Sequence, residues 1–431
     1  MDRYQEEQEH VGRVEISKAY EVQWQVTEGR AWAARTGGEY HTVELPDGHL
    51  ALLYWVASES DAHGYHCRSL YLGAFRPNEP GLDAIDLPAK PNTPVFTATK
   101  TAIRAAFWRN PEDALQIACL TGTGDRVREW LYLRLSQMNR HLGIFSQSGS
   151  GKSYAVGRLI EELLIKVKAV QDEKCEKTRR VRVIILDQNG DFRAFSESKK
   201  HSEILLSLER MFHNIPVFTP DYSWENWLEK RTKMLKSVHI YNKLDNIMSD
   251  EYEGKVIYHI ADLQDDRDGS KVMEVLESIS NPIFDGNRDE DRHDLTFIVI
   301  DEAHNIVPRE LISDDNNKNR KKTQRIINKS AAEGSKYGAF LIIISQSPSK
   351  VHPDTLSQCS NLMVMRLTRR EDIKTIADLR IDVPAELIGR IARFGQGDAL
   401  FIGDYVPAPA TARVVGRISK EGGSGPKVEE F

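Results

Sequence analysis

The fold of this chain is decided by one stretch, Phe145-Ser146-Gln147-Ser148-Gly149-Ser150-Gly151-Lys152-Ser153-Tyr154. Residues 142–145 before it are apolar like a short buried strand, and residues 155–164 after it carry apolar side chains at helical spacing. A glycine-rich turn between a strand and a helix points backbone N–H groups inward at the positive end of the helix dipole, where an anion is stabilised. The stretch therefore predicts a phosphate-binding loop (P-loop) in an α/β protein.

Individual positions of this loop match the chemistry of binding ATP and Mg²⁺. Lys152 is expected to reach the β- and γ-phosphates, and the hydroxyl of Ser153 is expected to ligate Mg²⁺. The predicted ATP-binding residues are Ser148, Gly149, Ser150, Gly151, Lys152, Ser153 and Tyr154. The usual pattern begins with glycine where this chain has Ser146, while the rest of the pattern is intact. The alternative is a glycine-rich turn with a solvated lysine.

Composition places the chain among ordinary globular proteins. It has 431 residues, 40% hydrophobic and 28% charged, which is enough for two or three domains. No apolar run is long enough to span a membrane, and the start lacks the apolar core of a signal peptide, so we expect a cytoplasmic protein without a membrane partner. Four scattered cysteines argue against a structural zinc site. Because the net charge is −6, any DNA binding must come from a local basic patch.

The strand pattern divides the chain into two predicted domains. Residues 1–105 hold short alternating strands separated by turns, which predicts a small N-terminal β-barrel for assembly; its candidate strands are 11–16, 22–26, 50–56 and 70–75. Residues 106–419 alternate near-continuous apolar strands with helices, the pattern of a mainly parallel sheet covered on both faces. The candidate strands there are 182–186, 215–218, 255–260, 296–300, 340–344 and 362–365. We predict a helical insertion around 199–250 and a flexible tail at 420–431.

A second motif, Asp301-Glu302-Ala303-His304, ends one of the apolar strands. Asp301 is expected to hold Mg²⁺ through water, and Glu302 to polarise the attacking water as a general base. Two adjacent carboxylates at a strand end are costly unless a cation or phosphate chemistry uses them. Together with the P-loop, the motif predicts a site for nucleotide hydrolysis.

Two other strand ends carry polar residues. The run from Asp187 to Phe192 follows the strand at 182–186 and puts two carboxylates and a turn at an end that we expect beside the P-loop. An Asn-Gly turn with solvated acids remains the alternative for that run. Gln346 follows the strand at 340–344 and is a candidate to sense the γ-phosphate or orient the water, as a glutamine does in other NTPases.

In this order, the motifs resemble the HerA family, the hexameric DNA translocases related to FtsK within the RecA-like P-loop ATPases. The resemblance covers nearly the whole chain and includes the barrel-like start at His10. Its motifs are residues 149–153, 187–192, 301–305, 333–338, 345–349, 356–361 and 366–368. The resemblance implies a RecA-like ATPase core that uses ATP and Mg²⁺.

The resemblance also implies a function. It implies an ATP-dependent duplex DNA translocase or helicase that acts as a homo-hexamer in DNA end processing or anti-phage defence. The implied partner is a NurA-like nuclease or a defence effector such as a Sir2-type NADase. The alternative is an ATP-regulated ring scaffold that activates such an effector without processive translocation. The polar and basic run 314–322 is a candidate to face the central channel and track DNA phosphates, with a solvated charge run as the alternative.

A ring of this kind uses an arginine from the neighbouring subunit to stabilise charge on the transferring phosphoryl group. The family usually carries that arginine where this chain has Ser335. Arg325 is the leading candidate for a trans-acting catalytic residue, and the other candidates are Lys336, Arg366 and Arg369.

Overall fold

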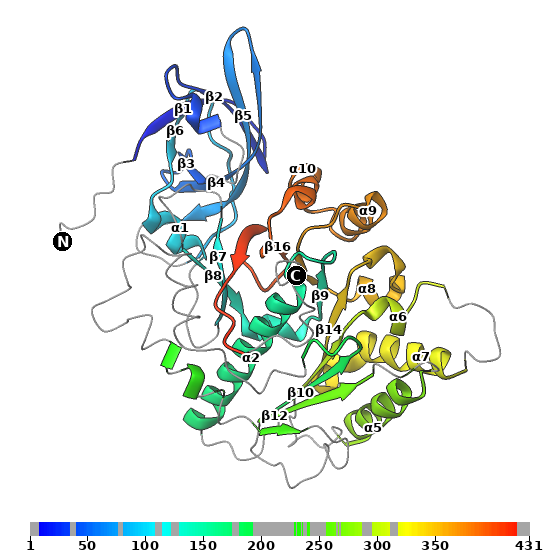
Figure 1. Ribbon diagram of the computed structural model, residues 1–431. Helices are drawn as coiled ribbons and strands as arrows, with labels where there is room; N and C mark the ends of the chain where they lie inside the picture. Colours follow the sequence, from blue (N-terminus) through cyan, green and yellow to red (C-terminus); the bar gives the residue numbers. More distant parts are fainter. Residues whose placement is uncertain are drawn as a thin grey trace, which may run out of the picture.

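The computed structural model joins a small barrel, at the top of Figure 1, to a larger α/β part below it. It describes residues 8–34, 40–75, 81–107, 114–121, 129–174, 181–192, 228–229, 231–233, 235, 239–241, 256–263, 266, 269–286, 295–310 and 318–419. The predicted strand at 215–218 and the predicted tail at 420–431 lie outside the described residues. So does most of the predicted insertion at 199–250.

The first strands close into a barrel in the order β1-β2-β5-β4-β3-β6. Alternate residues of β2 are buried, and a separate core forms around Trp24 and Trp55. Gly12 is needed where β1 passes Trp24, since a Cβ there would lie 2.5 Å from the indole ring. The predicted barrel is confirmed, and two strands that the sequence analysis did not assign, β3 and β6, complete it. The strands are β1 His10–Ser17, β2 Glu21–Val26, β3 Tyr40–Glu44, β4 Leu50–Asp61, β5 Gly64–Phe75 and β6 Pro94–Thr97.

The larger part is built on an 11-stranded sheet in the order β11-β12-β10-β13-β14-β9-β15-β16-β17-β7-β8. Strands from β11 to β15 pair in parallel, which confirms the predicted mainly parallel sheet. The last four strands continue it in antiparallel fashion, which was not predicted. The strands are β7 Ala114–Leu120, β8 Trp130–Arg134, β9 Leu142–Phe145, β10 Val181–Asp187, β11 His239–Tyr241, β12 Val256–Asp262, β13 Leu295–Ile300, β14 Ala339–Ser345, β15 Asn361–Val364, β16 Asp398–Ile402 and β17 Ala410–Val414.

Helices cover both faces of this sheet. The connection β9–α2–β10 crosses the sheet in one direction, whereas β12–α5–β13 and β13–α7–β14 cross it in the other. Because such crossovers are right-handed, α2 lies on one face and α5 and α7 lie on the other, as Figure 1 shows. The α-helices are α1 Lys100–Phe107, α2 Lys152–Lys174, α5 Ser270–Gly286, α6 Ala303–Ile306, α7 Lys318–Glu333, α8 Pro353–Ser357, α9 Arg370–Leu379 and α10 Ala385–Gly389. None of the helices in the described part is long and apolar enough to cross a membrane.

The predicted neighbour of the P-loop strand is wrong. We expected the strand that ends at Asp187 to lie beside the P-loop strand, but β13 and β14 separate β10 from β9. The connection through α2 passes over two strand positions, and the later strands β13 and β14 fill them. The register aligns Leu186 with Ile300 and aligns Ser345 with Phe145. The polar residues that follow β9, β10, β13 and β14 therefore meet along one edge of the sheet.

Candidate active site

The loop between β9 and α2 borders a cavity of about 500 Å³. Gly149 and Gly151 adopt φ of +77° and +92°, a left-handed conformation that favours glycine. Ser146 has no such requirement, because its φ is not positive. Its buried hydroxyl lies 2.6 Å from that of Ser150, which donates to the carbonyl of Gln147 at 2.7 Å. Serine at this position therefore supports the loop where the usual pattern has glycine.

The opposite wall of the cavity comes from the antiparallel end of the sheet, far along the chain. Gln396, Gly397 and Val414 line it, and the N–H of Gly397 donates to the carbonyl of Ser150 at 2.9 Å. Tyr154 also lines the cavity, and its hydroxyl accepts from the N–H of Arg417 at 2.9 Å. No local motif marks Gln396, Gly397 or Val414, so the sequence did not predict them as lining residues.

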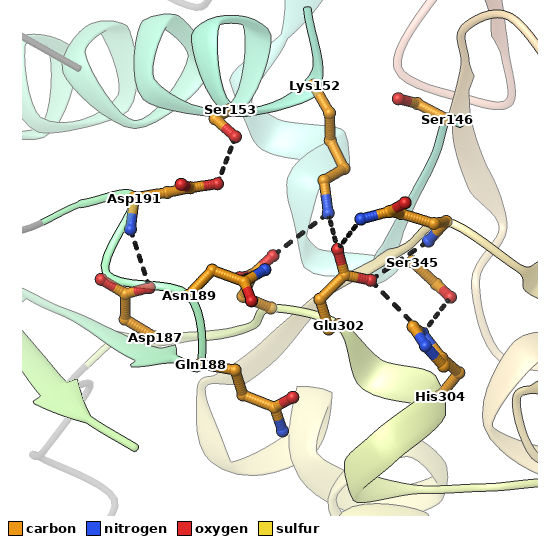
Figure 2. Close-up of polar contacts among 12 residues, drawn as sticks. Ser146, Lys152, Ser153, Asp187, Gln188, Asn189, Asp191, Glu302, His304 and Ser345 are labelled. Carbon is orange, nitrogen blue, oxygen red and sulfur yellow. Dashed lines mark hydrogen bonds and ion pairs between the residues drawn. The ribbon is translucent and has the colours of Figure 1, made fainter. Parts of the chain in front are cut away.

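Lys152, which lines this cavity, meets the two carboxylates that follow β13, and Figure 2 shows its contact with Glu302. The Lys152 ammonium forms an ion pair with Glu302 and lies 3.5 Å from Oδ1 of Asp301. Asp301 and Glu302 are only 1% and 3% exposed. A buried charge is stable only when it is paired, so the ammonium and the carboxylates stabilise one another here.

Glu302 is held in a strained backbone conformation. Its φ and ψ are +44° and +50°, in the left-handed region, where a non-glycine residue costs about 1–3 kcal/mol. Gln346 donates to it twice, from the side-chain amide at 2.5 Å and from the backbone N–H at 3.4 Å. The His304 ring nitrogen Nδ1 lies 3.3 Å from Glu302 Oε2 and 3.1 Å from Ser345 Oγ. These contacts fix the carboxylate in one orientation.

Burial and neighbouring charges give Asp301 and Glu302 different pKa values. Burial raises the pKa of Asp301 from its ordinary 3.8 to about 7, against the opposing attraction of Lys152. Burial acts in the same direction on Glu302, but the charge of Lys152 and hydrogen bonds from Lys152 and Gln346 outweigh it and lower the pKa of Glu302. Burial lowers the pKa of His304. Near neutral pH, Glu302 is therefore an ionised acceptor, while Asp301 readily holds a proton.

The run that begins at Asp187 serves two purposes. Asp187 accepts hydrogen bonds from the backbone N–H groups of Gly190, Asp191 and Phe192, at 2.8, 3.2 and 3.1 Å, so its carboxylate holds the turn. Asp191 instead accepts from the hydroxyl of Ser153 at 2.5 Å. Asn189 donates to Asp301 Oδ2 at 3.4 Å. Although β10 is not next to β9, its turn reaches both sides of the site.

Comparison with known proteins identifies the family. A family model described as "Helicase HerA, central domain" matches residues 120–375 of this chain. The chain belongs to the HerA family. The resemblance of its ordered motifs to that family is confirmed.

Relatives of this HerA-family chain are distant. The DNA double-strand break repair helicase HerA of Sulfurisphaera tokodaii is 24% identical over 402 residues, which cover 80% of this chain and 77% of that protein. A probable helicase of Methanocaldococcus jannaschii is 22% identical, over 76% of this chain and 71% of that protein. A solved structure that aligns with this chain is the genome packaging NTPase B204 of Sulfolobus turreted icosahedral virus 2 in complex with ATP-gammaS. The alignment covers 64% of this chain and 98% of the B204 chain, at 13% identity and a TM-score of 0.37. That structural similarity is too weak to inform function.

The oxygens of this HerA-family site suit Mg²⁺ bound together with a nucleotide. Ser153 and Asp191 line the cavity and meet there, and the buried Asp301 lies 3.5 Å from Lys152, which also lines it. Within the described residues, no group of three or more His, Cys, Asp or Glu side chains is arranged to hold a metal by itself. Mg²⁺ usually takes one or two carboxylates and completes its shell with water and phosphate oxygens, so the residues present fit this ion.

In the described part of the chain, no hydrogen bond or ion pair joins a candidate for the trans-acting arginine to Asp301 or Glu302. Arg325 is exposed on α7, and Lys336 lies in the short turn after that helix. Arg369 lies 3.9 Å from Asp372, while the backbone carbonyl of Arg366 accepts from the N–H of Gln147 at 2.9 Å. Arg325 therefore has no part in the site within a single protomer.

Proposed function

We propose that this HerA-family chain is an ATPase that uses hydrolysis to translocate along duplex DNA or unwind it. The observation that carries the proposal is the contact of Asp301 and Glu302 with Lys152, which lines the P-loop cavity. Names of relatives support the DNA substrate, since two of them are described as helicases.

Hydrolysis requires Lys152 to exchange its carboxylate partners for the phosphates of ATP. Lys152 leaves the two carboxylates and binds the β- and γ-phosphates of ATP, whose charge exceeds that of the carboxylate pair. Glu302 then accepts a proton from water, whose oxygen forms a bond to the γ-phosphorus as the bond to the ADP oxygen breaks. Gln346, which holds Glu302, orients that water. Bound Mg²⁺ would neutralise phosphate charge, with Ser153 as a ligand and Asp301 acting through water.

A ring of six such subunits is part of the proposal. Each ATP would lie between the P-loop of one subunit and an arginine of the next, with Arg325 as the first candidate because it is exposed on α7. Hydrolysis would then move neighbouring subunits past each other along the DNA. A native mass measurement of the assembled protein tests the stoichiometry.

A partner effector, either a NurA-like nuclease or an NAD-consuming defence enzyme, also belongs to the proposal. The competing form is a ring scaffold that activates its partner when ATP is bound but does not translocate. Glu302→Gln separates the two, because it is expected to bind ATP without hydrolysing it. Full partner activity with this variant favours the scaffold.

ATP turnover with and without duplex DNA tests the central proposal. We expect DNA to stimulate turnover in the assembled wild type. Lys152→Ala should lose both basal and stimulated turnover, and Glu302→Gln should keep ATP binding while turnover falls by about 10²–10⁴-fold. Turnover that DNA leaves unchanged in an assembled ring would rule out a DNA motor.

A further inference from the structure

A second cavity, of about 350 Å³, lies where β10, β12 and β13 end and where α5 and α7 pack together. Among the described residues, it shares no lining side chain with the P-loop cavity. Asn189, Asn305 and Arg320, which line it, are exposed, so the cavity opens to solvent. Nothing in the ATPase mechanism uses this space.

One wall of the cavity carries a buried donor that has no acceptor. Thr323 is 2% exposed, and within the described part of the chain its Oγ1 has no hydrogen-bond partner. A threonine inside a helix commonly donates to the carbonyl one turn earlier, but this hydroxyl does not. Buried polar atoms are nearly always paired, so an unpaired hydroxyl at a cavity marks a place for a ligand oxygen.

Positive charge lies next to this hydroxyl. Arg320 is three residues before Thr323 in α7, so the two side chains share a face of the helix. The Arg320 side chain passes Gly269, where a Cβ would lie 3.3 Å from its Cγ. The carboxylate of Asp266 also lines the cavity, but it accepts from the N–H groups of Lys271 and Val272, at 3.1 and 2.9 Å, at the start of α5.

Two residues of the cavity also contact the Asp301–Glu302 turn, one at a carboxylate and one at the backbone. Asn189 donates to Asp301 Oδ2 at 3.4 Å. Asn305 donates from its side chain to Gln188 Oε1 at 2.9 Å and from its backbone to the carbonyl of Glu302 at 2.8 Å. A ligand that moves either asparagine would therefore act directly on the strained Asp301–Glu302 turn.

We propose that this cavity binds a backbone phosphate of duplex DNA through Arg320 and Thr323, and that Asn189 and Asn305 link its occupancy to ATP hydrolysis. The inference rests on the proposed DNA function. The basic side chains of Lys318 and Lys321, which accompany Arg320 in the first turns of α7, favour DNA over a free anion because they extend the positive charge beyond the cavity; Lys322, next to them, is paired with Glu277. An extended polyanion gains from such a surface, and a single phosphate ion does not.

The test measures duplex DNA affinity over a range of salt concentrations for the wild type, Arg320→Gln and Thr323→Val. Arg320→Gln should reduce the slope of log affinity against log salt by about 1, because one phosphate contact is lost. Thr323→Val should weaken DNA binding about fivefold and raise the DNA concentration for half-maximal ATPase stimulation. Its melting temperature should not fall, because the hydroxyl that it removes has no partner. Arg370→Gln on α9 is the matched control, since it makes the same charge change away from the cavity and should behave like the wild type.

The outcomes separate this inference from the function on which it rests. A wild type that neither binds duplex DNA nor responds to it overturns both. A wild type that binds DNA, with both variants unchanged in affinity and salt slope, overturns only the cavity. Variants that lose ring assembly but keep DNA affinity would show that the cavity takes a neighbouring protomer's side chain, and so overturn it. Inorganic phosphate that stabilises the wild type through Thr323 without competing with DNA would also overturn it.

Discussion

Asp301→Asn should stabilise the protein in the absence of nucleotide, and by more at high pH. The folded protein raises the pKa of Asp301 from 3.8 to about 7, chiefly through burial. The folded state therefore binds more protons than the unfolded state between these values, and wild-type stability falls as pH rises through that window. At about 1.4 kcal/mol per pH unit, the stability of the wild type falls by about 4 kcal/mol in total across this window. Asparagine keeps the shape and avoids the buried charge.

Denaturant unfolding without nucleotide, from pH 5 to pH 8, tests this expectation. The stability advantage of Asp301→Asn over the wild type should grow by about 2 kcal/mol between pH 5 and pH 7 and level off by pH 8. Asp382→Asn is the control: a hydrogen bond from Arg380 lowers the pKa of that exposed carboxyl below 3.8, so its effect on stability should not change between pH 5 and pH 8. An Asp301→Asn variant that is less stable than the wild type at pH 8, or a difference independent of pH, would refute the reasoning.

Three other expectations follow from single contacts. Ser146→Ala should lower the free energy of unfolding by about 0.5–1.5 kcal/mol by removing the contact with Ser150, and Ser146→Gly should not rescue it, which urea titration can check. Gly157→Ala should raise the KM for ATP and lower the melting temperature, because the new Cβ would lie 2.4 Å from the guanidinium of Arg417, which donates to the Ser153 carbonyl. Gly389→Ala is the control, because the space around Gly389 is open. Gln346→Ala should reduce kcat more than ATP affinity, measured by single-turnover kinetics alongside nucleotide titration.

The sequence predicts the parts of this protein whose signal is local. Near-continuous apolar runs mark the parallel strands, because those strands are buried on both faces. The P-loop glycines are visible because the left-handed backbone at Gly149 and Gly151 requires that residue type. The proximity of Lys152 to Asp301 and Glu302 could also be anticipated, since parallel strands bring their carboxyl ends to one edge.

What the sequence could not predict depends on distant pairing. The antiparallel end of the sheet joins segments from opposite ends of the larger part, because β17 pairs with β7, which lies hundreds of residues earlier. For that reason Gln396 and Gly397 were not recognised as part of the nucleotide cavity. The order of the strands could not be predicted either: β13 and β14 lie between the strand that ends at Asp187 and the P-loop strand. The left-handed conformation of Glu302 has no signal in its residue type.

The position of Lys152 gives the site a built-in order of events. Without nucleotide, its ammonium neutralises Glu302 and lies near Asp301, so the proposed base is already paired. That ion pair lowers the pKa of Glu302 and so makes it a weaker acceptor for a water proton. In the proposed mechanism, phosphate binding would withdraw Lys152, and only then would the carboxylate, still held by Gln346 and next to His304, act as a base. Activation of the base thus requires the substrate, which prevents a buried, strained carboxylate from standing unpaired between turnovers.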